Sequence, residues 1–453
     1  MRIACSSMSK EVHVGRSFTW PNIREAKPLI YIRQEIQSLL DTNSFYGEYF
    51  KIKEDSSEEE IKEIVPKKKL KKIAPKKKLK EIVPKKKLKK TVPILPDDVI
   101  ILILSKLPVK SLLRFRCVSR LWSSLIFDPY FIEQHRFEHA NQDPNLLLLD
   151  RDRRIFSNFS LDIGTGTQEI YVLPKAVPKN WFSLSYCCHG LFLLSEYYKI
   201  HVCNPATREL ITLPQASQHI SFYVNPIQHA GLGYDDVAKQ YKIVRFFNPS
   251  SDTSLYHMEC EIFTLGRSDS WRRVCSIPYS LAAYPPAFVN GALYWKIETY
   301  SLMDIYTLII SFNLRDEKIS VIPHPTSCSD PNKNQCCMRV VQLGGCLGLT
   351  DSSIKPLMDI WMLQDYTKHI WIKTYSINLE TMYGYVNEVC IVYALAIHSN
   401  GYVSIYMNEE SAGISQFSFY DPRTNTIINV EGCQSLFFLS AAYAESLIQL
   451  RRR

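Results

Sequence analysis

Cysteine and histidine are the residue types in this chain that could bind a metal ion or attack a substrate, but their spacing favours neither. The 13 cysteines are scattered except for Cys187-Cys188 and Cys336-Cys337, and none stands in a CxxC pair. Their spacing fits no common zinc-ligand pattern, and His189 precedes a turn and a strand-like run. Motifs for nucleotide binding, serine hydrolysis and zinc proteolysis are absent from the sequence. We therefore expect no catalytic residue, no metal and no cofactor.

Lysine could make electrostatic contacts, and the basic charge is concentrated in one short segment. The formal net charge is +9, whereas residues 62–93 contain 15 Lys and 2 Glu. The other residues carry 39 basic and 43 acidic groups, so the rest of the chain is mildly acidic. A nonapeptide of the form IVPKKKLKK repeats over 64–93, where prolines and like charges oppose a helix. We expect residues 1–91 to be mostly disordered, with 67–90 acting as a solvated linker or a nuclear localisation signal.

The rest of the sequence indicates the cellular compartment in which the protein is expected. No apolar run approaches the length of about 18 residues that a membrane helix needs, and Val99–Leu104 is one of the short apolar runs. The first 17 residues contain no apolar signal-peptide segment. An odd number of scattered cysteines favours a reducing compartment. We expect the nucleus and/or the cytoplasm, and no membrane partner.

Residues 94–139 have the pattern of several short helices. Apolar residues recur at i, i+3, i+4 and i+7 over 100–107, which predicts one amphipathic helix. Residues suited to ending or starting the helices follow at Pro108, at Lys110 or Ser111, at Ser119 and at Asp128-Pro129. A module this small buries little apolar surface by itself. We therefore expect it to bind a protein partner through the apolar side chains left on its surface.

From about residue 145 onward, short strand-like runs alternate with polar turns. A strand, a turn and a second strand recur, with a mean separation of about 52 residues between turns. The turn markers are Asp162, Asn204, Gly266, Asn313, Gln364 and Asp421. This period predicts a β-propeller of about six four-stranded blades, and a β-sandwich is the alternative.

Two stretches resemble a known family. Residues 95–135, LPDDVIILILSKLPVKSLLRFRCVSRLWSSLIFDPYFIEQH, resemble the F-box. Seven downstream pieces resemble the kelch-like F-box-associated domain of plant F-box proteins. These pieces are CCHGLFLL, VCNPATREL, GLGYDDVAKQYKIVR, SWRRV, FVNGALYW, IISFNL and FYDPRTN.

The resemblance implies an α+β multidomain chain and a function in ubiquitination. The resemblance does not cover residues 1–91, which we expect to be a mostly disordered basic extension ahead of a small all-α F-box over 92–140. An all-β, propeller-like substrate-recognition domain of about six blades then covers 145–450. Such a chain is expected to be a non-catalytic substrate-recognition adaptor of an SCF-type cullin–RING E3 ubiquitin ligase. Its F-box binds a Skp-family linker, and through it the cullin and RING subunits, while the β-domain binds a target protein that the sequence does not identify.

The apolar residues of the F-box stretch are the candidate linker-binding residues, with Trp122 as the expected anchor because buried tryptophan often dominates interface energies. The set is Leu95, Pro96, Ile100, Ile103, Leu107, Pro108, Leu112, Leu113, Phe115, Val118, Trp122 and Ile126. The competing interpretation is that any one of these side chains belongs to the module's own core. Lys110, Arg114 and Arg116 could face an acidic linker surface or only solvent. The substrate-binding residues are unknown.

Two other functions remain open from the residues alone. A nuclear, nucleic-acid-associated regulator would use the Lys-rich tail for electrostatic contacts and the helical module as a helix-turn-helix. The module is too apolar for a recognition helix, so nucleic acid is not an expected partner. A propeller glycosidase would need paired carboxylates, and the sequence does not show which acidic residues are close in space.

Overall fold

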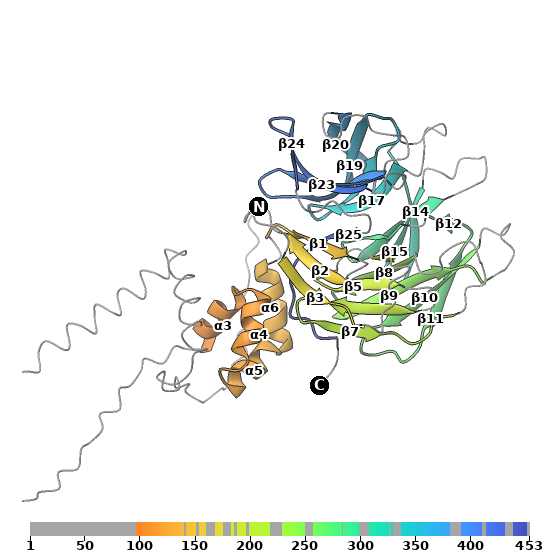
Figure 1. Ribbon diagram of the computed structural model, residues 1–453. Coiled ribbons are helices and arrows are strands. Elements are labelled where there is room, and N and C mark those ends of the chain that lie inside the picture. Colours follow the sequence, from red (N-terminus) through yellow and green to blue (C-terminus); the bar gives the residue numbers. More distant parts are fainter. Residues whose placement is uncertain are drawn as a thin grey trace, which may run out of the picture. The chain divides into compact units, whose positions relative to one another are not determined.

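The computed structural model describes most of the chain after residue 96 (Figure 1). The described residues are 97–139, 142–150, 154–159, 168–174, 183–184, 188–195, 199–217, 229–249, 257–282, 284–298, 308–325, 328, 337–380, 391–409, 414–430 and 438–450. The expected disorder of 1–91 and the Lys-rich repeat fall outside them. The described residues form two compact units, one with 97–107 and 114–124, the other with 108–113 and 125–450.

Four short helices occupy residues 97–139, as the apolar spacing predicts. They are α3 (Asp97–Ser105), α4 (Val109–Phe115), α5 (Arg120–Ile126) and α6 (Pro129–His139). The Ser119 hydroxyl accepts a hydrogen bond from the Trp122 amide at 3.1 Å. The Asp128 carboxylate accepts bonds from the amides of Tyr130 and Phe131, at 2.8 and 3.3 Å. Both predicted caps of α5 and α6 are therefore confirmed.

The start of α4 differs from the expected one. The helix begins at Val109 rather than at Lys110 or Ser111. The Pro108 carbonyl accepts hydrogen bonds from the amides of Ser111 and Leu112, at 3.0 and 3.1 Å. Proline has no amide hydrogen, but its carbonyl can accept the first hydrogen bonds of a helix. Pro108, which was expected to end the preceding helix, therefore also precedes and caps the start of α4.

The second unit contains a β-propeller of six blades, which confirms the predicted fold. Each blade is an antiparallel sheet, and in most blades the chain order runs outward from the centre. Blades 1 and 2 contain β25 (Phe438–Tyr443), β1 (Asn145–Asp150), β2 (Ile155–Phe159), β3 (Gln168–Val172), β4 (Ser183–Leu184), β5 (Phe192–Ser195), β6 (Ile200–Asn204) and β7 (Glu209–Thr212). Blades 3 and 4 contain β8 (Ala230–Asp235), β9 (Gln240–Phe247), β10 (Met258–Thr264), β11 (Arg272–Ile277), β12 (Ser280–Leu281), β13 (Ala287–Val289), β14 (Ala292–Glu298), β15 (Leu308–Asn313) and β16 (Ile319–Pro323). Blades 5 and 6 contain β17 (Met338–Leu343), β18 (Cys346–Asp351), β19 (Leu357–Asp365), β20 (Ile370–Asn378), β21 (Ile391–Ile397), β22 (Val403–Glu409), β23 (Ile414–Asp421) and β24 (Thr426–Asn429).

The ring closes through the last strand of the chain. In blade 1, β25 lies beside β1 and pairs with it antiparallel, from Asn145↔Tyr443 to Asp150↔Phe438 (Figure 1). Every pair of neighbouring blades also shares a cluster of buried apolar side chains. The cluster between blades 6 and 1, which contains Leu148, Leu395 and Phe419, completes the circuit. A propeller thereby buries both faces of its blades and leaves only short outer edges exposed.

The outer hairpins share one turn built on an aspartate or asparagine. The side-chain oxygen of Asn204, Asn313, Asp365 or Asp421 accepts a bond from a backbone amide two residues later. These are the predicted turn positions, except that Asp365 makes the turn instead of Gln364, whose longer side chain suits this local bond less well. Gly266 lies in the β10–β11 turn with a φ of 73°, and Asp162 lies outside the described residues.

Candidate functional site

Half of the predicted linker-binding residues lie inside the protein rather than on its surface. These are Ile100, Leu107, Leu112, Phe115, Trp122 and Ile126, each at most 6% exposed. Within the first unit, the Phe115 and Trp122 rings pack with their centroids 5.8 Å apart. These six side chains are therefore already covered in the free chain.

The other predicted residues are more accessible. Pro108 is exposed, and Ile103, Leu113 and Val118 are half-buried. Leu95 and Pro96 lie outside the described residues. The role of the whole set in linker binding stays a prediction, and the half-buried members are the ones whose side chains a partner can reach.

Sequence reasoning missed Leu121, whose side chain is 47% exposed on α5. The spacing contains a signal for it: Trp122 and Ile126, four residues apart, share the buried face of α5, and Leu121 lies off that face. Among the basic candidates, Lys110 and Arg114 are exposed and Arg116 is half-buried. Apolar and cationic side chains are therefore both available on this module.

In the propeller, a cavity of about 270 Å³ opens where the inner strands of five blades meet. Its lining residues are Cys188, His189, Phe288, Val289, Asn290, Gln342, Gly345, Leu395 and Ala442. The volume lies just below the usual range for small-molecule pockets, so it can admit a side chain or another small group.

Tight two-residue turns bring the polar groups of this cavity together. His189-Gly190, Asn290-Gly291 and Gly344-Gly345 have positive φ at both positions and connect strands or bridged residues of blades 2, 4 and 5. Only glycine, asparagine and a few other residues adopt this conformation at low cost. The hairpin at Asn290-Gly291 lies within the FVNGALYW stretch.

His189 is held in one protonation state at the edge of this cavity. Its Nε2 accepts a hydrogen bond from Arg136 at 3.2 Å, so its Nδ1–H donates to the Tyr241 hydroxyl at 3.1 Å. Burial, together with the neighbouring Arg136 cation, lowers the pKa of His189 to about 4. The imidazole is therefore neutral near pH 7, and its hydrogen bonds orient it as a structural group rather than as a nucleophile's base.

Helix α6 belongs to the same compact unit as the propeller. Its Arg136 forms an ion pair with Glu133 at 2.7 Å, and Ile132 packs into the apolar cluster of blades 2 and 3. The C-terminal segment joins the same region, since the Asn204 amide donates to the carbonyls of Ser446 and Ile448 at 3.1 and 2.8 Å. Helix α6 and the C-terminal segment are thereby both attached to the propeller.

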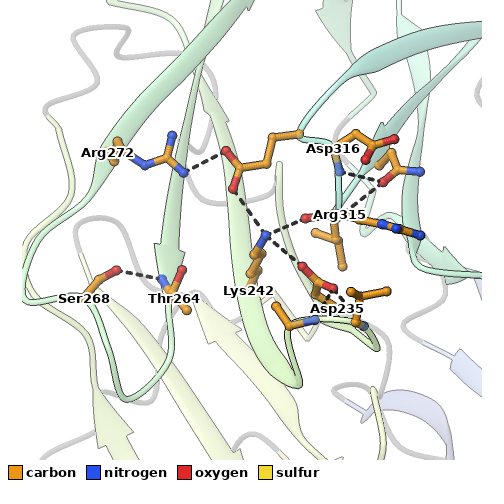
Figure 2. Close-up of polar contacts among 12 residues, drawn as sticks. Asp235, Lys242, Thr264, Ser268, Arg272, Arg315 and Asp316 are labelled. Carbon is orange, nitrogen blue, oxygen red and sulfur yellow. Dashed lines mark hydrogen bonds and ion pairs between the residues drawn. The ribbon is translucent and has the colours of Figure 1, made fainter.

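A buried charge network joins blades 3 and 4 (Figure 2). The Lys242 ammonium lies 3.1 Å from Asp235 and 3.3 Å from Glu317, and donates to the Leu314 carbonyl at 2.6 Å. Glu317 also binds Arg272 at 2.7 Å. Each carboxylate has a cationic partner, so the arrangement is a structural clamp between blades and offers no unpaired acid or base for catalysis.

Among the described residues, no group of three or more His, Cys, Asp and Glu side chains could hold a metal ion. No described helix is long and apolar enough to cross a membrane.

Comparison with known proteins decides the family. Residues 146–436 match the family model of the F-box associated beta propeller domain, and residues 93–134 match the F-box domain. This chain is a member of the F-box family with an F-box-associated propeller. An F-box/kelch-repeat protein of Arabidopsis thaliana is 28% identical over 310 residues, which cover 63% of this chain and 71% of that protein. The F-box protein CPR1 of Arabidopsis thaliana is 27% identical over 305 residues, covering 62% of this chain and 73% of that protein.

Likeness to solved structures is lower. The WD40 domain of SCAP from fission yeast is 12% identical, with a TM-score of 0.32, and the match covers 62% of this chain and 63% of that one.

F-box proteins with propellers of this kind are generally substrate adaptors of SCF complexes and are generally non-catalytic. The F-box implies a Skp-type partner within such a complex.

Proposed function

We propose that this F-box protein is the non-catalytic substrate-recognition subunit of an SCF-type cullin–RING ubiquitin ligase. Its helical module binds a Skp-family linker, and through it the cullin and RING subunits, while the six-bladed propeller binds the protein to be ubiquitinated. The observation that carries the proposal is the joint presence of both family matches in one chain, in the order that an adaptor needs.

The exposure of the helical residues supports a docking role. The half-buried Ile103, Leu113 and Val118 and the exposed Leu121 present apolar surface on a module whose core is already filled. Apolar side chains that a small module leaves accessible are typical of protein interfaces. Lys110 and Arg114 add positive charge that an acidic linker surface could complement.

Linker binding tests the first half of the proposal. The full chain should capture a purified Skp-family linker, and Ile103→Glu or Leu113→Glu should weaken capture at least tenfold, because a charge replaces apolar contact surface. Val172→Glu is the matched control, since Val172 is 59% exposed on the propeller strand β3. Undiminished capture by folded Ile103→Glu and Leu113→Glu proteins would refute the assignment of this surface.

The location of the protein is a second part of the proposal. We propose that the Lys-rich repeat over 67–90 directs the chain to the nucleus, with the remainder able to work in the nucleus or the cytoplasm. A fluorescent fusion lacking 62–93 should lose nuclear enrichment but keep linker capture. Loss of nucleic-acid binding together with a changed partner profile would instead favour the regulator hypothesis.

A further inference from the structure

Two cysteines stand directly opposite each other in blade 3. Cys260 on β10 pairs in register with Cys275 on β11, one pair beyond Glu259↔Ser276. Directly opposed residues of an antiparallel pair have Cα atoms about 4.5–5.5 Å apart. A disulfide requires Cα atoms about 4.4–6.8 Å apart, a range that includes directly opposed pairs. The register of β10 and β11 shifts only after Cys260, so Cys260 and Cys275 are the last opposed pair before the irregularity.

The two side chains also share one face of the sheet. Cys260 is fully buried in the apolar cluster between blades 3 and 4, and the partly buried Cys275 packs against the same cluster. Both are free thiols, and Cys275 is the more accessible of the two. An oxidant can therefore reach the Cys275 sulfur, and the buried Cys260 thiol lies next to it.

The contact between the sulfurs prepares Cys275 for reaction. The Cys260 thiol donates a hydrogen bond to the Cys275 sulfur, which lowers the pKa of Cys275 below its ordinary value. The same hydrogen bond, together with burial, raises the pKa of Cys260. The thiolate is the reactive form of cysteine, so Cys275 is the attacking sulfur and Cys260 the resolving one.

We propose that Cys260 and Cys275 are a thiol pair that a peroxide converts reversibly into a cross-strand disulfide. The Cys275 thiolate attacks a peroxide oxygen and the O–O bond breaks, which gives a sulfenic acid and, after proton uptake, one water from hydrogen peroxide. The Cys260 sulfur then attacks the Cys275 sulfur, the S–S bond forms, and a second water leaves with the Cys260 proton. Two thiols lose two electrons, and one hydrogen peroxide is reduced.

The link would tie the outer strand of blade 3 to its neighbour. On β11, Arg272 binds Glu317 of blade 4 and Arg273 binds Glu259 of β10, at 2.7 and 2.8 Å. A disulfide beside these ion pairs limits the opening of β11, which is the edge strand of its blade. The amides of β11 should therefore exchange with solvent several-fold more slowly in the oxidised protein.

The test compares the purified full chain before and after treatment with hydrogen peroxide. Peptide mapping should find a Cys260–Cys275 link that a thiol reductant removes. Cys346→Ser is the matched control, since Cys346 is also half-buried, on β18, and its variant should still form the link. Cys275→Ser should abolish the link and leave Cys260 reduced.

Two outcomes would overturn the proposal. One is a stable sulfenic acid or mixed disulfide at Cys275 while Cys260 remains alkylatable in the unfolded chain. The other is a link between either residue and a different cysteine. Because Cys275 is only partly buried, Cys275→Ser is expected to fold, and circular dichroism of the variant verifies this before oxidation.

Discussion

The buried Lys242 gives the sharpest stability prediction. Its side chain is 8% exposed and Asp235 is 3% exposed, so replacing the lysine leaves a carboxylate with little access to water. The change Lys242→Met keeps most of the side-chain length and removes the ammonium. It also removes the donor to the Leu314 carbonyl and one of the two cations that bind Glu317.

The expected cost follows from this burial. Removing one partner of a buried ion pair typically destabilises a protein by about 3–5 kcal/mol, because the charge left behind is uncompensated. Arg272→Ala is the matched control in the same network, because Arg272 is 59% exposed. An exposed ion pair contributes at most about 1 kcal/mol, so the control should stay close to the wild type.

Urea unfolding followed by tryptophan fluorescence measures both variants. The pH dependence adds a second reading. Burial raises the pKa of Asp235, but hydrogen bonds from the Ala238 amide and Lys242 outweigh it and hold the pKa below 3.8. The stability gained through Asp235 is therefore complete above its unfolded pKa and declines as the pH falls below it. Equal costs for Lys242→Met and Arg272→Ala, both below about 1 kcal/mol, would refute the reasoning.

Two further predictions concern α6 and its attachment. Because the folded pKa of His189 is about 4 and its ordinary value is 6.5, the unfolded chain takes up the proton first. Stability through His189 is complete above pH 6.5 and falls by about 2 kcal/mol at pH 5, a loss that His189→Asn should lack in urea titrations at both pH values. Asp128→Ala should cost about 1 kcal/mol of unfolding free energy, since the amides of Tyr130 and Phe131 lose their capping acceptor. An unchanged urea midpoint for Asp128→Ala would contradict the capping argument.

The blade count could be predicted because the turns are local. Asn204, Asn313 and Asp421 each bind backbone amides two or three residues later, so the turn chemistry is contained in a few adjacent positions. The same locality explains the success at Ser119 and Asp128, whose side chains cap the helices that directly follow them.

Contacts between distant residues had no such signal. Lys242 and Glu317 are 75 residues apart, and Asn204 reaches Ile448 across 244 residues. Nothing in the residues next to each of these side chains indicates its distant partner. The pairs are seen only once the ring of blades has formed. The attachment of α6 through Arg136 and His189 was missed for the same reason.

The helical module shows that apolar spacing alone does not separate core residues from accessible ones. The periodicity of apolar residues identifies which side chains are buried from solvent, but it does not say whether the chain itself or a partner protein buries them. Trp122 is 2% exposed and packs against Phe115, whereas Ile103 on α3 and Leu113 on α4 keep part of their surface. In a module with so small a core, the tryptophan is needed to hold the helices in place. The side chains that keep surface accessible to a partner are the half-buried aliphatic ones and the exposed Leu121.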